Sequence, residues 1–236
     1  MELTEDAICR GLLRLRQPRR GYRFNLDSVL LAAFGAAEAR PGLLIDAGAG
    51  CGVVGLYLSA VLGRPALLVE RQPVMAALAA QNAALNALKS VNVVRGDFRS
   101  IPVRDGSVGL LACNPPYLEP GSGRASPREQ RLLSLHTVHG GIAEVVAEAG
   151  RVLAPGGVLA CILPAAVASS LAVGALHLRR RMDLSPQPGG SVTRCLVLLA
   201  REPGPAVVEA RAVHGAAARF APWVEDILEG RARRLQ

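Results

Sequence analysis

The stretch LLIDAGAGCGVVGLYL, residues 43–58, decides the fold. It opens as an apolar run, Leu43–Ala47, which predicts a buried strand with the acidic Asp46 at its end. Gly48, Gly50 and Gly52 follow, and a helical apolar pattern begins at Val53. Glycines let a backbone turn tightly and approach a ligand closely, and the first N–H groups of the next helix have no partner inside it. The stretch therefore predicts a strand, a ligand-binding turn and a helix.

The same alternation continues along the chain. Apolar runs that predict strands are Leu43–Ala47, Ala66–Val69, Val91–Val94, Val108–Cys113 and Val158–Leu163, and helical patterns between them cover Val53–Leu62, Val74–Leu88 and Ile142–Leu153. This order is typical of an α/β fold, a mostly parallel sheet with helices on both faces. Near the end, Arg181–Leu184 and Arg194–Ala200 flank the turn-prone SPQPGGS and predict an antiparallel hairpin.

We expect one domain over residues 1–236. Its core would span 41–200, preceded by an extension or lid (1–40) with a helix from about Asn25 to Ala39, and followed by a tail (201–236). Half of the residues are hydrophobic, enough for a sizeable core. Val152–Leu176 carries no charge, but Pro155-Gly156-Gly157 and Pro164 divide it, which favours a buried strand and helix over a membrane span.

Composition indicates the cellular compartment and the kinds of partner to expect. The five cysteines form no C-x-x-C pair, which fits a reducing cytosol and predicts neither a disulfide framework nor a metal site. The acidic start Met1–Asp6 does not resemble a secretory signal. The net charge of +8 comes almost entirely from arginine, which reflects either base composition or attraction to a polyanion such as RNA or DNA.

Two further acids end strands of the predicted sheet. Glu70 closes the second strand, where it could grip a ribose diol, and Asp97 follows the third. Gly50 to Gly55 also satisfies the dinucleotide pattern G-x-G-x-x-G, but two residues late. A loop beginning D-x-G-x-G-x-G instead resembles the S-adenosylmethionine loop of Rossmann-like class I methyltransferases. That resemblance implies a seven-stranded sheet, adenine contacts from Asp97 and the neighbouring Phe98, and no metal; the plain alternative for Asp97 is a turn or N-cap.

The strand Val108–Cys113 ends abruptly at Asn114-Pro115-Pro116-Tyr117. Prolines cannot donate to a sheet, so carbonyl groups there stay free, and the Asn114 side chain adds an acceptor. Two aligned acceptors can hold a planar amine, and Tyr117 offers a face for stacking. The four residues resemble the N/D-P-P-Y motif of methyltransferases that act on adenine, guanine or glutamine amines. The resemblance implies that Asn114 and the Pro115 carbonyl orient the amine.

Two longer stretches, QPRRGYRFNLDSVLLAAF (17–34) and NPPYLEPGSGRASPREQR (114–131), resemble the bacterial tRNA(Val) adenine-N6 methyltransferase family. This resemblance implies methyl transfer to the exocyclic amine of adenine in tRNA, and a role for Asp27 in closing over the methionine end of the cofactor. Ser126-Pro127 matches the family's Ser/Thr-Pro. Ser134–Thr137 departs from the Ala-Arg-His-Glu of the family, which leaves the RNA target open, and His136 with His139 lacks the partners of a metal site.

Other functions remain possible at this point. A release-factor glutamine methyltransferase would carry a separate helical N-terminal domain, a ribosomal-RNA guanine methyltransferase often has Phe for Tyr117, and a DNA adenine methyltransferase usually has a recognition insertion. A non-catalytic protein that binds the cofactor and RNA would have no need for Asn114 and Tyr117. Nothing in the sequence indicates a membrane or an obligate protein partner.

Arginine clusters are the candidate RNA surface. They comprise Arg14, Arg16, Arg19, Arg20 and Arg23 around Tyr22, and Arg179, Arg180 and Arg181. For Arg231, Arg233 and Arg234 an ordinary solvated surface is the favoured interpretation.

Overall fold

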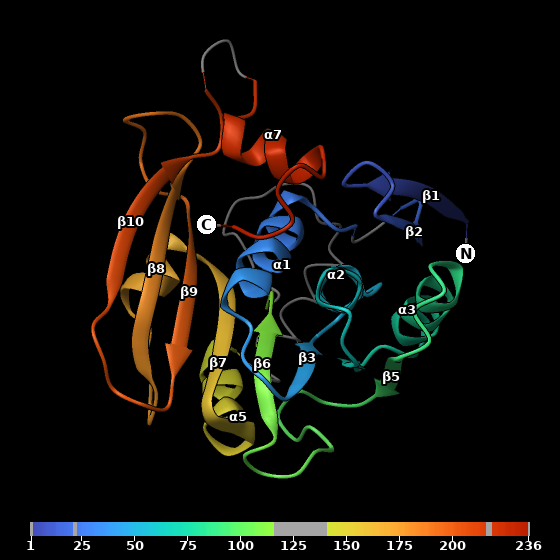
Figure 1. Ribbon diagram of the computed structural model, residues 1–236, viewed down its shortest axis with the longest axis horizontal. Coiled ribbons are helices and arrows are strands. Elements are labelled where there is room, and N and C mark those ends of the chain that lie inside the picture. Colours follow the sequence, from blue (N-terminus) through green and yellow to red (C-terminus); the bar gives the residue numbers. More distant parts are fainter. Residues whose placement is uncertain (1, 21–22, 116–140, 216–218, 236) are drawn as a thin grey trace.

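The computed structural model describes residues 2–20, 23–115, 141–215 and 219–235, and it contains a large central sheet and a small hairpin. The strands of the central sheet follow the order β10-β8-β9-β7-β6-β3-β4-β5 (Figure 1). They are β3 (Leu43–Ala47), β4 (Ala66–Glu70), β5 (Val91–Arg95), β6 (Val108–Cys113), β7 (Leu153–Pro164), β8 (His177–Ser185), β9 (Arg194–Ala200) and β10 (Val207–Ala212).

The expected mostly parallel sheet with a C-terminal antiparallel hairpin is confirmed. Strands β3 to β7 pair in parallel, and β9 pairs antiparallel with both β7 and β8. Within the described residues the sheet has eight strands rather than the expected seven, because β10 pairs in parallel with β8. That strand lies in the segment 201–236, which was expected to be a tail. It is an edge strand with Val207 and Val208 exposed, and it lacks the long apolar run by which the buried strands were found.

Helices cover both faces of the sheet (Figure 1). Helices α1 (Leu26–Glu38), α2 (Val53–Leu62) and α3 (Pro73–Leu85) pack into one apolar core with the short α7 (Pro222–Leu228). Helices α5 (Ile142–Val152) and α6 (Ala165–Ser169) lie on the core of the other face. The central strand β6 is buried along its whole length, which explains its unbroken apolar sequence.

The N-terminal residues form a hairpin that the sequence did not predict. Strand β1 (Leu3–Ile8) pairs antiparallel with β2 (Leu13–Pro18), and Leu13 and Leu15 enter the α1–α2–α3 core. On its free edge β2 meets α3, because the side-chain amides of Asn82 and Asn86 bond to its backbone. The expected helix at 25–39 is confirmed as α1.

The uncharged stretch from Val152 to Leu176 contains the expected strand, β7, and the expected helix, the short α6, although α6 has no buried residue. In the part of the chain that the structure describes, no helix is both long and apolar enough to cross a membrane.

Candidate functional site: a glycine loop and an Asn-Pro corner at one sheet edge

The glycine loop sits where β3 ends, beside the end of β4. Gly48 and Ala49 both donate to the Val69 carbonyl, at 2.9 and 3.1 Å, so the loop continues the pairing of β3 with β4. Gly48, Gly50 and Gly52 have φ of 76°, 56° and 96°, a region that favours glycine. Added Cβ atoms at Gly48 and Gly50 would point into open space or reach no closer than 3.9 Å from Met75, so this side of the loop can receive a ligand.

Glu70 stabilises the loop from the tip of β4. Its Oε2 accepts from the Gly50 N–H at 2.9 Å, and its Oε1 accepts from the Gln72 N–H at 2.7 Å. The side chain is nearly buried, with 6% of its surface exposed. Each carboxylate oxygen has a second acceptor site, so the group keeps the capacity to accept further hydrogen bonds.

Asp46 faces the interior. Its Oδ2 accepts from the Gly55 N–H in the first turn of α2 at 2.8 Å, and the side chain is 2% exposed. Burial, with a smaller contribution from the charge of Glu70, raises the pKa of Asp46 to about 7. The structure therefore places this carboxylate under the loop, where it fixes the start of α2.

Asp97 and Phe98 follow β5, one strand beyond Glu70. The Gly96 N–H donates to the Glu70 carbonyl at 3.1 Å, which brings this turn to the site. The Asp97 carboxylate is held by Arg99, with Nε–Oδ1 and Nη2–Oδ2 distances of 2.9 and 2.6 Å, and hydrogen bonding from Arg99 lowers the pKa of Asp97. Phe98 packs at the edge of the second core.

The Asn-Pro corner lies at the end of β6, next to β3, since Ala47 and Cys113 are register partners. The Asn114 Nδ2 donates to Ser28 Oγ at 3.2 Å, which directs the amide nitrogen toward α1. Among the described residues no donor reaches Asn114 Oδ1, so this oxygen is available to an amine. Pro116 and Tyr117, as well as Ser126, Pro127 and His136, lie outside the described residues.

Ser28 and Arg194 are site residues that sequence reasoning missed. Ser28 is a buried serine at the start of the apolar run of α1, and a small polar residue directly before Val29–Ala33 is the signal that could have found it. Arg194, the first residue of β9, donates from Nε to Asp27 Oδ2 at 3.1 Å. Asp27 is therefore positioned at the first turn of α1, beside Ser28.

The expected arginine surface is largely engaged with the protein itself. Seven of its eight arginines contact carboxylates or carbonyl oxygens: Arg14, Arg16, Arg19, Arg23, Arg179, Arg180 and Arg181. Their acidic partners are Glu2, Glu5, Asp6, Glu38, Glu209 and Asp183. Arg20 is exposed, and no partner for it appears among the described residues. The described residues also hold no cluster of three metal-binding side chains.

A glycine loop, an acid at the end of the next strand that bonds to this loop, and an Asn-Pro corner lie at the same ends of the parallel strands, which is the arrangement of a class I methyltransferase. The sequence profile of the methyltransferase small domain family matches residues 27–170. The chain belongs to this family and is an S-adenosylmethionine-dependent methyltransferase.

Within that class, the chain belongs to the tRNA1(Val) (adenine(37)-N6)-methyltransferase family. The member from Erwinia tasmaniensis is 30% identical over 206 residues, which cover 84% of this chain and 82% of that protein. A release factor glutamine methyltransferase from Nitratidesulfovibrio vulgaris is also 30% identical, but over 58% of this chain and 50% of that protein. The fold is shared with a predicted O-methyltransferase from Agrobacterium tumefaciens, at a TM-score of 0.64 and 22% identity over 89% and 98% of the two chains.

Proposed function

We propose that this methyltransferase modifies the exocyclic N6 amine of an adenine in tRNA. The main support is the position of Asn114 at the end of β6. Its amide nitrogen is bonded to Ser28, and no donor of the described residues reaches its amide oxygen. The names and the broad coverage of the relatives support tRNA as the substrate. An adenine in a folded tRNA loop must be swung out of its stack to reach this corner.

The glycine loop fits S-adenosylmethionine, because the backbone at Gly48 and Gly50 leaves space that a side chain would fill. Glu70 would hold the ribose, Asp97 and Phe98 the adenine, and Asp27 the methionine end. When bound, this cofactor supplies a methyl group on a positively charged sulfur. Asp46 and Gly52 then act indirectly, since they shape the loop.

The chain's part in the reaction is orientation. Asn114 Oδ1 and the Pro115 carbonyl would each accept one hydrogen of the acceptor amine, and this would aim its lone pair at the cofactor methyl group. Ser28 keeps the Asn114 amide in the rotamer that this needs. Pro116 and Tyr117 would complete the corner, with Tyr117 stacked on the base. Alignment of two reactants is a large source of rate enhancement. The nitrogen–methyl bond would form as the sulfur–methyl bond breaks, and the methylated amine would then release its extra proton to water, so no acid–base pair is required.

The test uses the full chain with methyl-labelled S-adenosylmethionine and, in separate reactions, total tRNA, ribosomal RNA, DNA and release factor. We expect label in tRNA, and N6-methyladenosine after nucleoside digestion. Asn114→Ala serves as the catalytic control. Label in release-factor glutamine, or in guanosine, would overturn the adenine assignment and favour the other amines that such a corner can hold.

We place the proposed activity in the cytoplasm, where tRNA is found.

A further inference from the structure

The C-terminal segment, residues 229–235, is fixed across helices α1 and α2. The Leu235 N–H donates to the Ala33 carbonyl of α1 at 3.0 Å, and Leu235 itself is 3% exposed. The Tyr57 hydroxyl of α2 donates to the Arg233 carbonyl at 3.0 Å. Arg10, from the turn of the N-terminal hairpin, pairs with Glu229. The backbone of this segment is therefore an ordered part of the surface.

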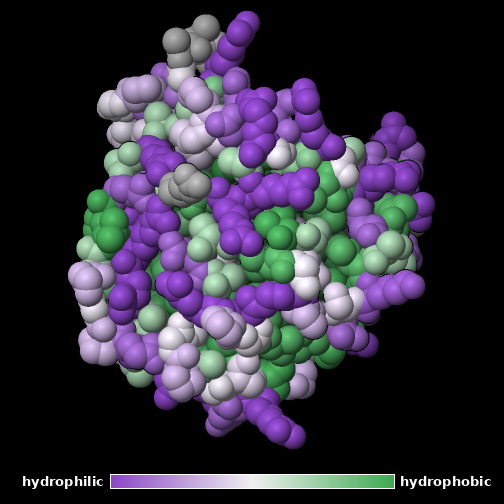
Figure 2. Space-filling view, viewed as in Figure 1, coloured by the Kyte–Doolittle hydropathy of each residue, from purple (hydrophilic) through white to green (hydrophobic). Residues whose placement is uncertain are grey.

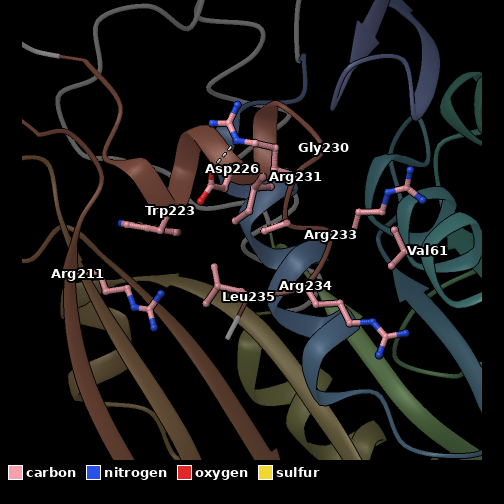
Figure 3. Close-up of a pocket in the computed structure, with 11 residues that line it drawn as sticks. Val61, Arg211, Trp223, Asp226, Gly230, Arg231, Arg233, Arg234 and Leu235 are labelled. Carbon is pink, nitrogen blue, oxygen red and sulfur yellow. Dashed lines mark hydrogen bonds and ion pairs between the residues drawn. The ribbon is translucent and has the colours of Figure 1, made fainter.

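A groove of ≈ 850 Å³ runs beside this segment, between α7, the end of α2 and β10 (Figure 3). Four arginines and a single carboxylate, Asp226, line it. Figure 3 shows Arg211 on the β10 side and Arg233 and Arg234 on the α2 side. Hydrophilic residues also gather over α7 and the C-terminal segment on this face in Figure 2.

The arginines of this groove differ in their pairing. Arg231 Nε bonds to Asp226 Oδ1 at 2.7 Å, and Arg211 bonds to Glu209 and lies over the Trp223 ring at 5.7 Å. Arg233 and Arg234 are exposed, and their guanidinium groups have no hydrogen-bond or ion-pair partner in the described part of the chain. Two adjacent positive charges on an ordered backbone therefore remain uncompensated.

A second groove, lined by β8, β9 and β10, shows the opposite case. Its Arg180 is bonded to Glu38 and Glu209, and its Arg179 donates to two carbonyl oxygens. Such paired arginines are already neutralised and gain less from a phosphate. Of the two grooves, the C-terminal one therefore has the larger unpaired positive charge.

The groove also lies close to the methyl-transfer corner. The segment is bonded to α1 at Ala33, and Asn114 is bonded to α1 at Ser28, five residues earlier. Because each helical residue advances about 1.5 Å, Ala33 and Ser28 are about 7.5 Å apart along the helix axis. A nucleic acid with one base at Asn114 would have its neighbouring phosphates within reach of this surface.

We propose that the C-terminal groove docks the phosphate backbone of the RNA substrate, with Arg233 and Arg234 as its main contacts. Arginine binds phosphate through several N–H donors in a planar fork, and such contacts position an RNA without reading its sequence. The proposal rests on the function proposed above, since it assumes that the substrate is tRNA.

The test compares two double variants with the same loss of charge. Arg233→Gln with Arg234→Gln changes the groove, whereas Lys89→Gln with Arg104→Gln changes exposed residues that precede β5 and β6, at the opposite edge of the sheet. Binding of total tRNA is measured over a series of salt concentrations, S-adenosylmethionine binding by calorimetry, and methyl transfer by KM and kcat. The cofactor titration also reports whether each variant is folded.

We expect the groove variant to bind tRNA roughly tenfold more weakly or worse, with a salt slope reduced by about two phosphate contacts. Its KM for tRNA should rise while kcat and cofactor affinity stay unchanged, and the control should match the wild type. Unchanged tRNA affinity and slope in the groove variant would overturn the docking inference while leaving the enzyme a tRNA methyltransferase. A wild-type protein that neither binds nor methylates tRNA would instead overturn both proposals.

Discussion

Replacement of Asn82 by alanine tests whether α3 joins the N-terminal hairpin to the glycine loop. Asn82 is fully buried, and its amide makes three hydrogen bonds. Nδ2 donates to the carbonyls of Arg16 and Cys51, both at 2.9 Å, and Oδ1 accepts from the Arg16 N–H at 2.8 Å. One side chain therefore connects a helix, the edge of β2 and the loop proposed to hold the cofactor.

Asn86 provides a matched control one helical turn later. Its amide pairs with the N–H and carbonyl of Arg14 at 2.8 and 2.7 Å in an exposed position. Four helical residues span about 6.0 Å and two strand residues about 6.6 Å, so the two asparagines match the Arg14–Arg16 repeat. Both variants remove a similar pair of strand contacts, but only Asn82 touches the loop.

The two substitutions should differ in free energy of unfolding. Asn82→Ala leaves three backbone groups without partners, the buried Cys51 carbonyl and the half-buried N–H and carbonyl of Arg16. A buried group left unpaired costs about 1–3 kcal/mol and a half-buried one less, so we expect a loss of about 3 kcal/mol. Water can replace the Asn86 amide, and there we expect about 1 kcal/mol or less. That difference is large against a total stability of roughly 5–15 kcal/mol.

Urea unfolding gives both stabilities, and calorimetry gives the affinity for S-adenosylmethionine. We expect weaker cofactor binding only in Asn82→Ala, because the Cys51 carbonyl then loses its restraint. If Asn82→Ala does not fold, Asn82→Ser, which can keep one donor, is measured in its place. Equal losses in stability for the Asn82 and Asn86 variants, or full cofactor affinity in a folded Asn82 variant, would refute the coupling.

Three more predictions concern the site. Asn114→Ala should keep cofactor affinity but lower kcat by about 100-fold or more, and Ser28→Ala should lower it less, since only the rotamer is freed; steady-state kinetics with tRNA checks both. Gly48→Ala should abolish cofactor binding, whereas Gly63→Ala, at a similar φ of 63° and also in open space, should only lower the melting temperature. Asp46 has a raised pKa in the folded state, so the stability of the wild type should fall as the pH rises from about 4 to 7. Asp46→Asn should flatten this pH profile and should be more stable than the wild type at pH 8. Thermal melts over this pH range check both expectations.

The strands β3 and β6 matched their sequence predictions because each is a central strand of a parallel sheet. Such strands are apolar on both faces and are bounded by Gly or Pro, so local sequence is sufficient to find them. The glycine loop could also be predicted from the sequence, because its three positive φ angles favour glycine. The N-terminal hairpin was not, because Asn82 and Asn86 hold its edge from about 70 residues away.

The direction of each acidic side chain also depends on packing. Asp46 and Glu70 both end strands at the same edge, and both were candidate cofactor-binding residues. Asp46 is placed beneath the loop by its bond to Gly55, while Glu70 bonds to the loop itself. Which face of the loop a carboxylate meets is decided by how α2 lies on the sheet, and no local pattern records this.

Local sequence also does not show which arginines are paired with carboxylates in the folded protein. The arginine cluster near the N-terminus was the stronger candidate for RNA binding because it adjoins the expected cofactor lid and includes Tyr22. In the folded hairpin, however, the register sets Glu5 opposite Arg16. Once folded, the carboxylates of β1 neutralise much of that cluster. At the C-terminus, no carboxylate of the described residues pairs with Arg233 or Arg234, because their segment crosses helices α1 and α2 at the apolar Ala33 and at Tyr57. An RNA surface is therefore better sought where folding leaves arginines unpaired than where the sequence has the most of them.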